Sequence, residues 1–500
     1  MHIRLRSAAG MALGALTAWA IGAASSAPAQ PLSYTPPSCP PVDYHSAPAL
    51  RPAAVCMNLG VTTHGTPPRD YLFLTPGGNY GTGAGIFQTN GTLVWWQRAR
   101  SRMESDISVV HYHGHAYLAV WSGKASFDDP YGMGTVSLYG QHYQLAGRIT
   151  SGAPFGPDRI DGHEFQLTPQ GDALFGIYDP VSAPYQGRRV EVYQYVVQKV
   201  SLVRGAHGIH TGRVLFQWES LKHVPLSQSY VRAPSNHTVW DYFHGNAIGQ
   251  DGRGKLIISS RNTWGIYEVS TKTGRTIWQV GAKGDHVLPS PWSWQHDVVP
   301  LGQHRYSLFD DGADAPGCTS GSQHASRALV VQVLPSRHGA GVKLLQAYDH
   351  TPAICSGFCG SVQLIHGGDV LINWGQVPEI TEDRQTGGNP LMDLSLSNWS
   401  CRGYLSPWTG EPLAKPAVAA YSHATHTDVW ASWNGSTQTT AWQVLAGRSA
   451  SRLAPVESPT AKRGFETEIV LNHPYASVAV EALGSDGHVL STSRAVPPRQ

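Results

Sequence analysis

The feature that most limits the fold is a repeated element, a glycine followed by a short strand of apolar and aromatic residues. These positions recur at intervals of about 56 to 69 residues. A repeat of this length that holds several strands is typical of a β-propeller blade with long loops. The marks are GTLVWW at Gly91, GRIT at Gly147, GRVLFQW at Gly212 and GRTIW at Gly274, with weaker versions at Gly341 and Gly410. Six marks predict a six-bladed β-propeller.

Short alternating runs between these marks support an all-β chain. Lys255–Ser259, Gly265–Val269 and Thr276–Val280 each alternate apolar and polar residues and are bounded by turn residues. Sustained helical periodicity is almost absent. The 54 glycines, 35 prolines and 16 tryptophans suit many tight turns and aromatic packing.

The chain changes character near residue 420. From His426 onward, alternating strands follow one another closely, separated in part by turns at Asn434-Gly435 and Asp486-Gly487. This density of strands predicts a small β-sandwich of immunoglobulin or fibronectin-III type. We therefore divide the chain into residues 1–29, a signal peptide; 30–69, an extended arm over a propeller edge; 70–420, the propeller; and 421–500, the sandwich.

The N-terminus indicates export. Arg4 and Arg6 precede an alanine-rich apolar run, and Ala27-Pro28-Ala29 offers a small-residue cleavage site. We expect a periplasmic or extracellular protein with no membrane attachment after cleavage. Six cysteines in an exported chain predict up to three disulfides. The local pairs would be Cys39 with Cys56 and Cys355 with Cys359, leaving Cys318 with Cys401, although other pairings remain open.

Charge and histidine content narrow the chemistry. Charged residues make up only 14% of the chain and the net charge is +2, so we expect no nucleic-acid partner. Among the 24 histidines, His163, His244 and His296 lie in polar segments, each ahead of an expected strand. Equivalent positions on successive blades meet around the central channel of a propeller. Each histidine could instead be a structural link between strands.

One ordered set of motifs resembles a known family. The run DYFHGN…LIISSRNTWGIYEVSTKTGRTIWQVGAK…WSWQHD…LFDDG is similar to the arylsulfotransferase family of bacterial propeller enzymes, most of all to its secreted branch. The resemblance is dense from about Asp241 to Gly312. It extends upstream through Gly162-His163-Glu164-Phe165 and downstream through the fibronectin-like tail.

The resemblance implies a mechanism. In this family a histidine in the Trp-Gln-His context takes the sulfuryl group from a phenolic sulfate and passes it to an acceptor phenol, and His296 matches it. His244, Asn246, Arg261 and, more loosely, His163 match the rest of that site. No nucleotide sulfate donor is implied, and we expect no cofactor and no metal.

The residue types fit this chemistry. A neutral imidazole at His296 can act as nucleophile, His244 or His163 can exchange protons, and Arg261 can stabilise the developing negative charge. Asn246 could hold the sulfuryl oxygens or an imidazole tautomer. Asp297 should point away from the nucleophile because strand side chains alternate. The aromatic residues Trp294, Tyr242 and Phe243 could line a ring-binding wall, although core packing is the alternative.

Three residues depart from the family pattern, and two other functions remain open. Gly245 stands where the family usually has an aliphatic residue, Asn262 where its best-known members have histidine, and Asp311 where asparagine is common. One alternative is a non-catalytic propeller that binds a ligand or partner. The other is a metal-dependent hydrolase with the three histidines as ligands, which Arg261 would disfavour.

Overall fold

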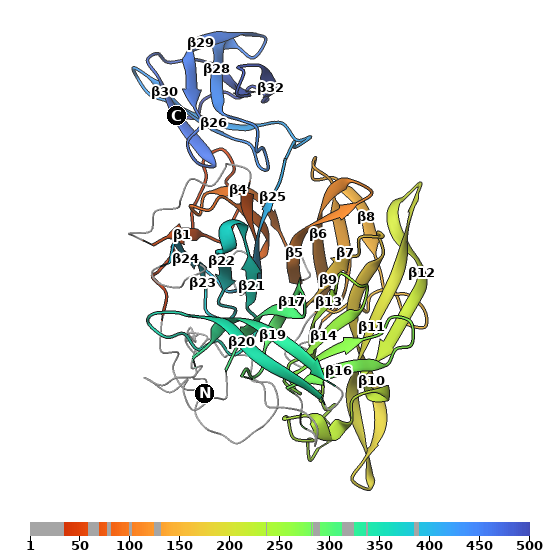
Figure 1. Ribbon diagram of the computed structural model, residues 1–500. Helices are drawn as coiled ribbons and strands as arrows, with labels where there is room; N and C mark the ends of the chain where they lie inside the picture. Colours follow the sequence, from red (N-terminus) through yellow and green to blue (C-terminus); the bar gives the residue numbers. More distant parts are fainter. Residues whose placement is uncertain are drawn as a thin grey trace, which may run out of the picture.

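The computed structural model describes residues 35–58, 70–77, 82–99, 103–124, 132–236, 238–281, 283, 291–312, 325–336, 339–384 and 390–500. The described chain is all-β, as predicted (Figure 1). Three short 3-10 helices accompany the strands there: η1 (Ser220–Lys222), η2 (Leu226–Gln228) and η3 (His366–Gly368). The expected signal peptide lies outside the described residues. No helix among the described residues has the length and apolar character needed to cross a membrane.

Residues before 410 form sheets that divide into six sets of antiparallel strands. The first set closes late in the sequence, because β25 (Ser400–Pro407) pairs with β2 (Asp70–Pro76), which continues into β3 (Gly83–Phe87) and β4 (Leu93–Arg98). The second and third sets join into one eight-stranded sheet through a two-residue parallel contact between β8 and β12. Its strands are β5 (Met103–Tyr112), β6 (His115–Lys124), β7 (Met133–Tyr139), β8 (Leu145–Ile149), β9 (Phe165–Leu167), β10 (Ala173–Tyr185), β11 (Arg188–Gly205) and β12 (Gly208–Glu219).

The remaining three sets follow the same pattern of consecutive hairpins. The fourth holds β13 (Gly245–Gln250), β14 (Leu256–Ser260), β15 (Gly265–Val269) and β16 (Thr276–Val280). The fifth holds β17 (His296–Gly302), β18 (Arg305–Asp310), β19 (Arg327–Ser336) and β20 (Gly339–Asp349). The sixth holds β21 (Ser361–Leu364), β22 (Val370–Asn373), β23 (Glu379–Asp383) and β24 (Met392–Leu396), and β1 (Val55–Met57) pairs with its outer strand.

Each of the six sets has β5, β9, β13, β17, β21 or β25 at one edge, and we call this edge strand its first strand; β25 is the first strand of the first set. The six first strands contact one another in a closed cycle: β5 contacts β9, and the contacts continue through β13, β17, β21 and β25 back to β5. Each pair of neighbouring sets also shares its own hydrophobic cluster. Phe73 and Val120 join the first two sets, for example, and Trp121 and Phe175 join the next two. Burial between sets therefore repeats around the cycle, which fixes the relative positions of the first strands.

The glycines of the repeated sequence element lie in or just before the fourth strand in five of the six sets. Gly91 and Gly274 lie in turns with φ of 84° and 71°, a conformation that favours glycine, just before β4 and β16. The next three marks lie inside β8, β12 and β20, namely Gly147, Gly212 and Gly341. The sixth mark is wrong, because Gly410 follows β25 and the fourth strand of the last set is β24.

The C-terminal region, blue at the top of Figure 1, contains two sheets. One consists of β26 (Ala417–Ser422), β27 (Thr427–Ser432) and β30 (Glu466–Leu471). The other consists of β29 (Arg452–Ala461), β28 (Ala441–Ser449), β31 (Ser477–Leu483) and β32 (Val489–Thr492). Val429 from the first sheet and Trp442 and Val480 from the second share one hydrophobic core.

The disulfides confirm one predicted pair and contradict the other two. Cys39 and Cys56 are bonded as expected. Cys359 is bonded to Cys401, so the predicted pairs of Cys355 with Cys359 and of Cys318 with Cys401 are both wrong. The start of β21 lies against β25, where the Gly360 N–H donates to the Cys401 carbonyl, so two cysteines far apart in sequence meet. Cys355 is also disulfide-bonded, and Cys318 lies outside the described residues.

Candidate active site

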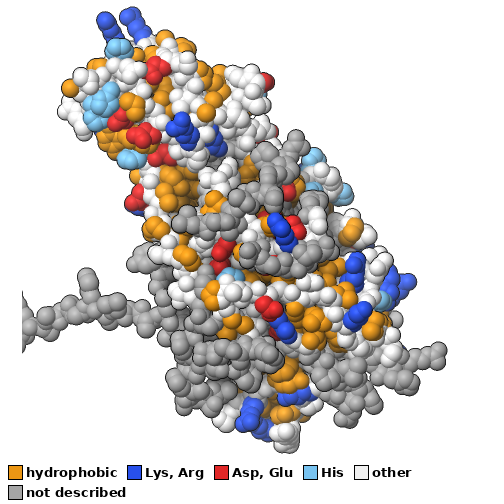
Figure 2. All heavy atoms as spheres, turned by 60° about the vertical axis from the view of Figure 1, so that its left-hand side comes forward, with side chains coloured by type: hydrophobic (Ala, Val, Ile, Leu, Met, Phe, Trp, Pro, Cys, Tyr) orange, Lys and Arg blue, Asp and Glu red, His pale blue; other side chains and the backbone are white. Residues whose placement is uncertain are grey.

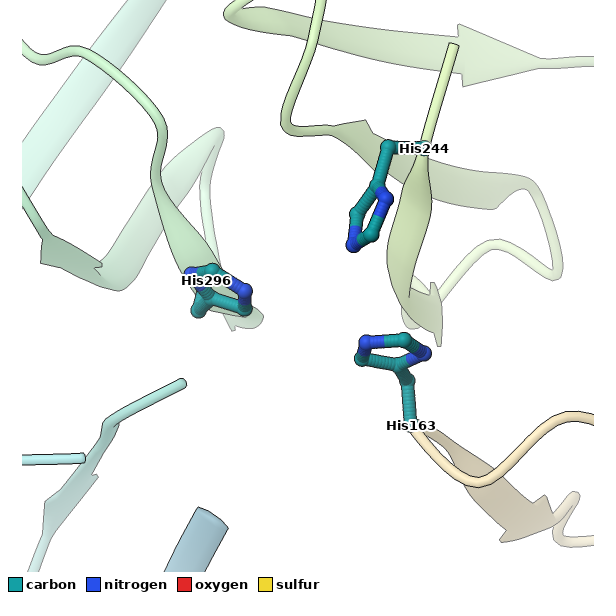
Figure 3. A group of neighbouring side chains, drawn as sticks. All are labelled: His163, His244 and His296. Carbon is teal, nitrogen blue, oxygen red and sulfur yellow. The ribbon is translucent and has the colours of Figure 1, made fainter. Parts of the chain in front are cut away.

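Three histidines converge where the first strands of three successive sets begin. His163 lies two residues before β9, His244 directly precedes β13, and His296 is the first residue of β17. The ring centroid of His163 is 5.2 Å from that of His244 and 6.4 Å from that of His296. One ring nitrogen from each lies within 4.8 Å of the others, and Figure 3 shows the three rings facing a common space. The structure thus brings together the histidines that the sequence singled out.

An aspartate holds each of these imidazoles. Nδ1 of His163 lies 2.9 Å from Asp161, Nδ1 of His244 lies 2.5 Å from Asp241, and Nδ1 of His296 lies 2.7 Å from Asp311. Because each Nδ1 faces a carboxylate, Nε2 is the nitrogen directed toward the common space. A carboxylate that accepts from one ring nitrogen fixes the orientation of the imidazole and its tautomer. Sequence reasoning did not assign a role to these aspartates.

Two of the three aspartates could have been found from local spacing. The backbone N–H of His163 donates to Asp161, and that of His244 donates to Asp241. Aspartate commonly forms such turns with a backbone N–H a few residues on, so the Asp-x-His and Asp-x-x-His spacings carry the signal. Asp311 has no such signal, because it reaches His296 across the β17–β18 hairpin, 15 residues away.

The electrostatic environment keeps His296 neutral. Burial lowers the pKa of His296 well below its usual value, and the Arg261 cation and the two neighbouring histidines lower it further. The backbone N–H of Cys359 also donates to Nε2 of His296 over 3.3 Å, so Nε2 is the unprotonated nitrogen. Burial lowers the pKa of His244 as well, although Asp241 opposes this shift. His296 therefore presents a nitrogen lone pair near neutral pH.

Arg261 lies close enough to His244 and His296 to lower the pKa of both, and Asn246 follows His244 by two residues; both retain unused hydrogen-bonding capacity. Arg261 donates through Nη2 to the Gly357 carbonyl over 3.0 Å, and Asn246 donates through Nδ2 to the Gln295 carbonyl over 2.7 Å. Within the described chain, buried atoms without a hydrogen-bond partner include Arg261 Nε, Asn246 Oδ1 and Gln295 Oε1. Buried polar groups are normally satisfied, so such a concentration is typical of a site that binds a polar ligand.

The predicted aromatic wall is divided by the fold. Trp294 lies beside the site, with the Arg261 guanidinium 4.7 Å from its ring centroid. Tyr242 and Phe243 are wholly buried in the hydrophobic cluster between the third and fourth sets, and the Tyr242 hydroxyl donates to Ser220. This placement supports core packing for Tyr242 and Phe243 and gives no support to contact with a substrate.

Each departure from the family pattern makes a contact at the site. A Cβ at Gly245 would lie 2.2 Å from the ring of Tyr195, whose hydroxyl donates to Asp161. Asn262 donates to both the carbonyl and the carboxylate of Asp241. Asp311 is the partner of His296. The three substitutions are therefore integrated into the group of residues that orients the histidines.

A buried arginine ties the histidine segments together. Arg402 on β25 is 4% exposed and donates to Glu164 over 2.8 Å and to the Asn246 carbonyl over 2.7 Å. It also lies 3.5 Å from Asp297, whose carboxylate accepts from the Val362 N–H and so points away from the His296 ring, as expected. Glu164 and Asp297 directly follow His163 and His296 in sequence. Arg402 thus links the backbones that carry all three histidines, a role that sequence reasoning missed.

The Cys359–Cys401 disulfide gives a prediction that links stability with the site. Its sequence separation of 42 residues corresponds to about 4 kcal/mol of loop-closure stabilisation. We expect the double variant Cys359→Ser/Cys401→Ser to lose free energy of unfolding of that order in urea denaturation. It should also lose activity, because the Cys359 N–H contacts His296.

The second disulfide supplies the matched control. Cys39 and Cys56 are 17 residues apart, which corresponds to about 3 kcal/mol, and Cys56 lies on β1, beside the outer strand of the sixth set. The variant Cys39→Ser/Cys56→Ser should lose stability and retain activity. Equal loss of activity in the two double variants, measured under conditions where both are folded, would contradict the link to His296.

Comparison with known proteins supports the family assignment. The description Arylsulfotransferase (ASST) matches residues 108–393, which include all three histidines, and no curated protein matches. Solved structures include a protein of unknown function from Bacteroides caccae (11% identity, 65% of this chain and 94% of that chain, TM-score 0.39). They also include virginiamycin B lyase from Staphylococcus aureus (9% identity, 69% and 99%, TM-score 0.26). These TM-scores are too low to carry an argument, whereas the family match spans more than half of the sequence: the chain belongs to the arylsulfotransferase (ASST) family.

Proposed function

We propose that the protein transfers a sulfuryl group from a phenolic sulfate ester to an acceptor phenol through a sulfo-histidine at His296. The observation that carries this proposal is the state of His296: a buried neutral imidazole, oriented by Asp311, whose Nε2 faces two more histidines. Neutral nitrogen nucleophiles of this kind divide one difficult displacement into two easier steps.

The reaction can be written with these residues. The Nε2 lone pair of His296 attacks the sulfur of the ester, the bond from sulfur to the phenolic oxygen breaks, and the phenolate leaves with the electron pair. A protonated histidine gives its proton to the phenolate. The acceptor phenol then returns a proton to that histidine as its oxygen attacks the sulfur and the N–S bond breaks. No nucleotide donor takes part.

We assign the proton exchange to His163. The pKa of His244 is lowered by burial, which disfavours the protonated form that a general acid needs at the start. The His163 side chain is 16% exposed, against 5% for His244, and its Nδ1 faces the buried carboxylate of Asp161. Arg261 and Asn246 would stabilise the charge that develops on the sulfuryl oxygens.

The proposal includes the architecture and the location. We propose that the six strand sets are the blades of a propeller that ends with β25, and that the two sheets from β26 onward form a β-sandwich, because residue 420 lies inside β26. The closed cycle of first strands and the hydrophobic cluster between every two neighbours support the propeller, and the core shared by two sheets supports the sandwich. Disulfide bonds are consistent with an exported protein.

A coupled assay tests the activity. Purified protein is mixed with 4-nitrophenyl sulfate, with and without phenol, and nitrophenolate release and phenyl sulfate formation are followed. We expect release that depends on phenol, with one phenyl sulfate formed for each nitrophenolate. Release that proceeds equally without phenol, with free sulfate as product, would indicate hydrolysis and overturn the proposal.

A metal-dependent hydrolase is a second candidate that one observation favours. Three ring nitrogens within 4.8 Å, each backed by a carboxylate, are also the arrangement of a three-histidine metal site. The cation of Arg261 close to the same space opposes binding of a metal ion. Metal analysis of the protein after dialysis against a chelator separates the two: sulfuryl transfer should persist in metal-depleted protein, and a hydrolase should lose its activity.

The lowered pKa of His296 sets the pH dependence of the first step. Protonation removes the lone pair, so the rate falls as the pH drops through the pKa of His296 in the folded protein. Since this pKa is well below the usual 6.5, we expect the acid-side decline in the rate of donor cleavage to lie well below pH 6.5. A stopped-flow measurement of nitrophenolate release gives this profile. An acid-side decline centred at or above pH 6.5 would contradict the assignment.

A further inference from the structure

A second cluster of metal-ligand side chains lies on the C-terminal region, away from the proposed active site. His423, His426 and Asp428 occupy the turn and the start of β27 in the β26–β27 hairpin. Figure 2 shows histidine and acidic side chains next to each other on the surface of this region. The His423 and His426 side chains are 46% and 38% exposed, and that of Asp428 is 18% exposed. Nothing in the proposed sulfuryl transfer uses these residues.

The hairpin itself places the three side chains on one face. Register pairs Ser422 with Thr427 and Tyr421 with Asp428. Thr427 is buried toward the core, so the alternation of strand side chains directs its two neighbours, His426 and Asp428, to the outer face. The His423 N–H donates to the His426 carbonyl and closes the turn, which brings the first histidine over the second. The two imidazole rings are stacked, with centroids 4.2 Å apart.

The distances fit a small transition-metal ion. His423 Nε2 lies 3.0 Å from one Asp428 oxygen, and His426 Nε2 lies 3.6 Å from the other. Ligands at 2.0–2.1 Å from a tetrahedral zinc ion are separated by about 3.3 Å, and the two distances, each to a different oxygen of the carboxylate, lie on either side of this value. One ligand atom from each residue lies within 4.8 Å of the others. Nε2 of both histidines already faces the Asp428 carboxylate.

The outer contacts also suit ligation. Nδ1 of His426 lies 3.3 Å from the Thr425 hydroxyl, which can hold the ring with Nε2 directed to Asp428. Metal-binding histidines commonly use their second nitrogen in this way. A lone exposed histidine–carboxylate pair needs no such explanation, and the same region has one in His488 and Asp486. What distinguishes the hairpin is a second imidazole that faces the same carboxylate.

We propose that His423, His426 and Asp428 bind one divalent transition-metal ion, with Zn²⁺ as the expected ion. Two imidazoles and one carboxylate favour borderline ions such as zinc over Ca²⁺ or Mg²⁺, which prefer oxygen ligands. Three protein ligands leave at least one coordination position for water. In the metal-bound state the ion would join both sides of the turn between β26 and β27, and this link would reduce the motion of the hairpin.

Calorimetric titration of the full-length protein with ZnCl₂ tests the site. We expect one equivalent of zinc to bind with an affinity that His426→Ala and Asp428→Asn each lower by more than the roughly 10- to 100-fold that loss of a hydrogen-bond partner of a metal ligand costs. Both side chains are at the surface, and Asp428→Asn keeps the hydrogen-bonding shape, so the fold should be retained. Amide hydrogen exchange supplies a local readout: zinc should slow exchange in residues 422–428 of the original protein and not in His426→Ala.

The controls separate this site from the histidines of the candidate active site. His488→Ala removes the histidine of the His488–Asp486 pair and should leave the titration unchanged. His163→Ala should still bind the zinc equivalent that His426→Ala loses. The proposal is overturned if His426→Ala binds zinc as the original protein does. It is also overturned if the bound equivalent disappears in His163→Ala instead. Neither outcome depends on whether the protein transfers sulfuryl groups.

Discussion

Replacement of His296 by glutamine or alanine is expected to reduce phenol-dependent nitrophenolate release by at least about 10³-fold. The side chain supplies the nucleophile in the proposed mechanism, and removal of a catalytic nucleophile leaves only the binding and charge-stabilising contributions of the site. Arg261 and the other histidines would remain in place, so binding of the donor should be less affected than turnover. The measurement is the steady-state rate with 4-nitrophenyl sulfate and phenol.

A covalent readout makes the assignment specific. After incubation with donor and no acceptor, one added sulfuryl group should be found by mass spectrometry on a peptide that contains His296, and it should be absent in His296→Gln. Asp311→Ala should retain the covalent adduct but lower the rate by about 10- to 100-fold, because it removes the partner that orients the ring. Surface variant His488→Ala is the control. Undiminished turnover in His296→Ala would show that the nucleophile is another residue.

Replacement of Arg402 by methionine should lower the free energy of unfolding strongly, because it removes a buried cation. The guanidinium lies among Glu164, Asp297 and the Asn246 carbonyl, and these partners are all buried. Without the cation, carboxylates remain buried and unpaired, and removal of one member of a buried ion pair typically costs 3–5 kcal/mol. We expect a lower denaturation midpoint in urea, followed by tryptophan fluorescence, together with weaker activity because the histidine segments lose their common anchor.

Two further variants show whether charge or shape is responsible. Arg402→Lys retains the cation but not the fork geometry that serves several acceptors, so it should lose less stability than Arg402→Met. Arg452→Met removes an exposed arginine from β29 and should change the midpoint little. If Arg402→Met were as stable as the unchanged protein, the buried ion network would not contribute to the fold as we describe.

Much of the fold was predictable because its signals are local. Alternation and turn glycines identified three of the four strands of the fourth set, and Gly265–Val269 and Thr276–Val280 were predicted with their observed bounds. The glycine marks also found the last strand of five sets. The sixth failed because turn glycines are common outside blades, and Gly410 belongs to the connection after β25.

In the candidate site, too, some residues could be predicted from local sequence signals and others could not. The motifs around His163, His244 and His296 identified the residues that meet, and the Asp-x-His and Asp-x-x-His spacings hold two of their partners within one turn. The aromatic residues could not be assigned from sequence, because Tyr242 and Phe243 are equally suited to a core and to a binding wall. Burial decided this question, since both side chains are enclosed by the cluster between two sets.

What the sequence by itself determined is the set of local features: an all-β chain, the order of its strands, and the histidine motifs at the starts of three of them. The tertiary structure alone decided the partners that come from distant segments, namely Asp311 on His296, Cys401 on Cys359, and Arg402 among the histidine segments. The physical reason is that each contact depends on pairing or packing that periodicity along the chain does not record. Cys401 and Arg402, both on β25, reach their partners only when the cycle of first strands closes, whereas Asp311 reaches His296 through the register of the β17–β18 hairpin.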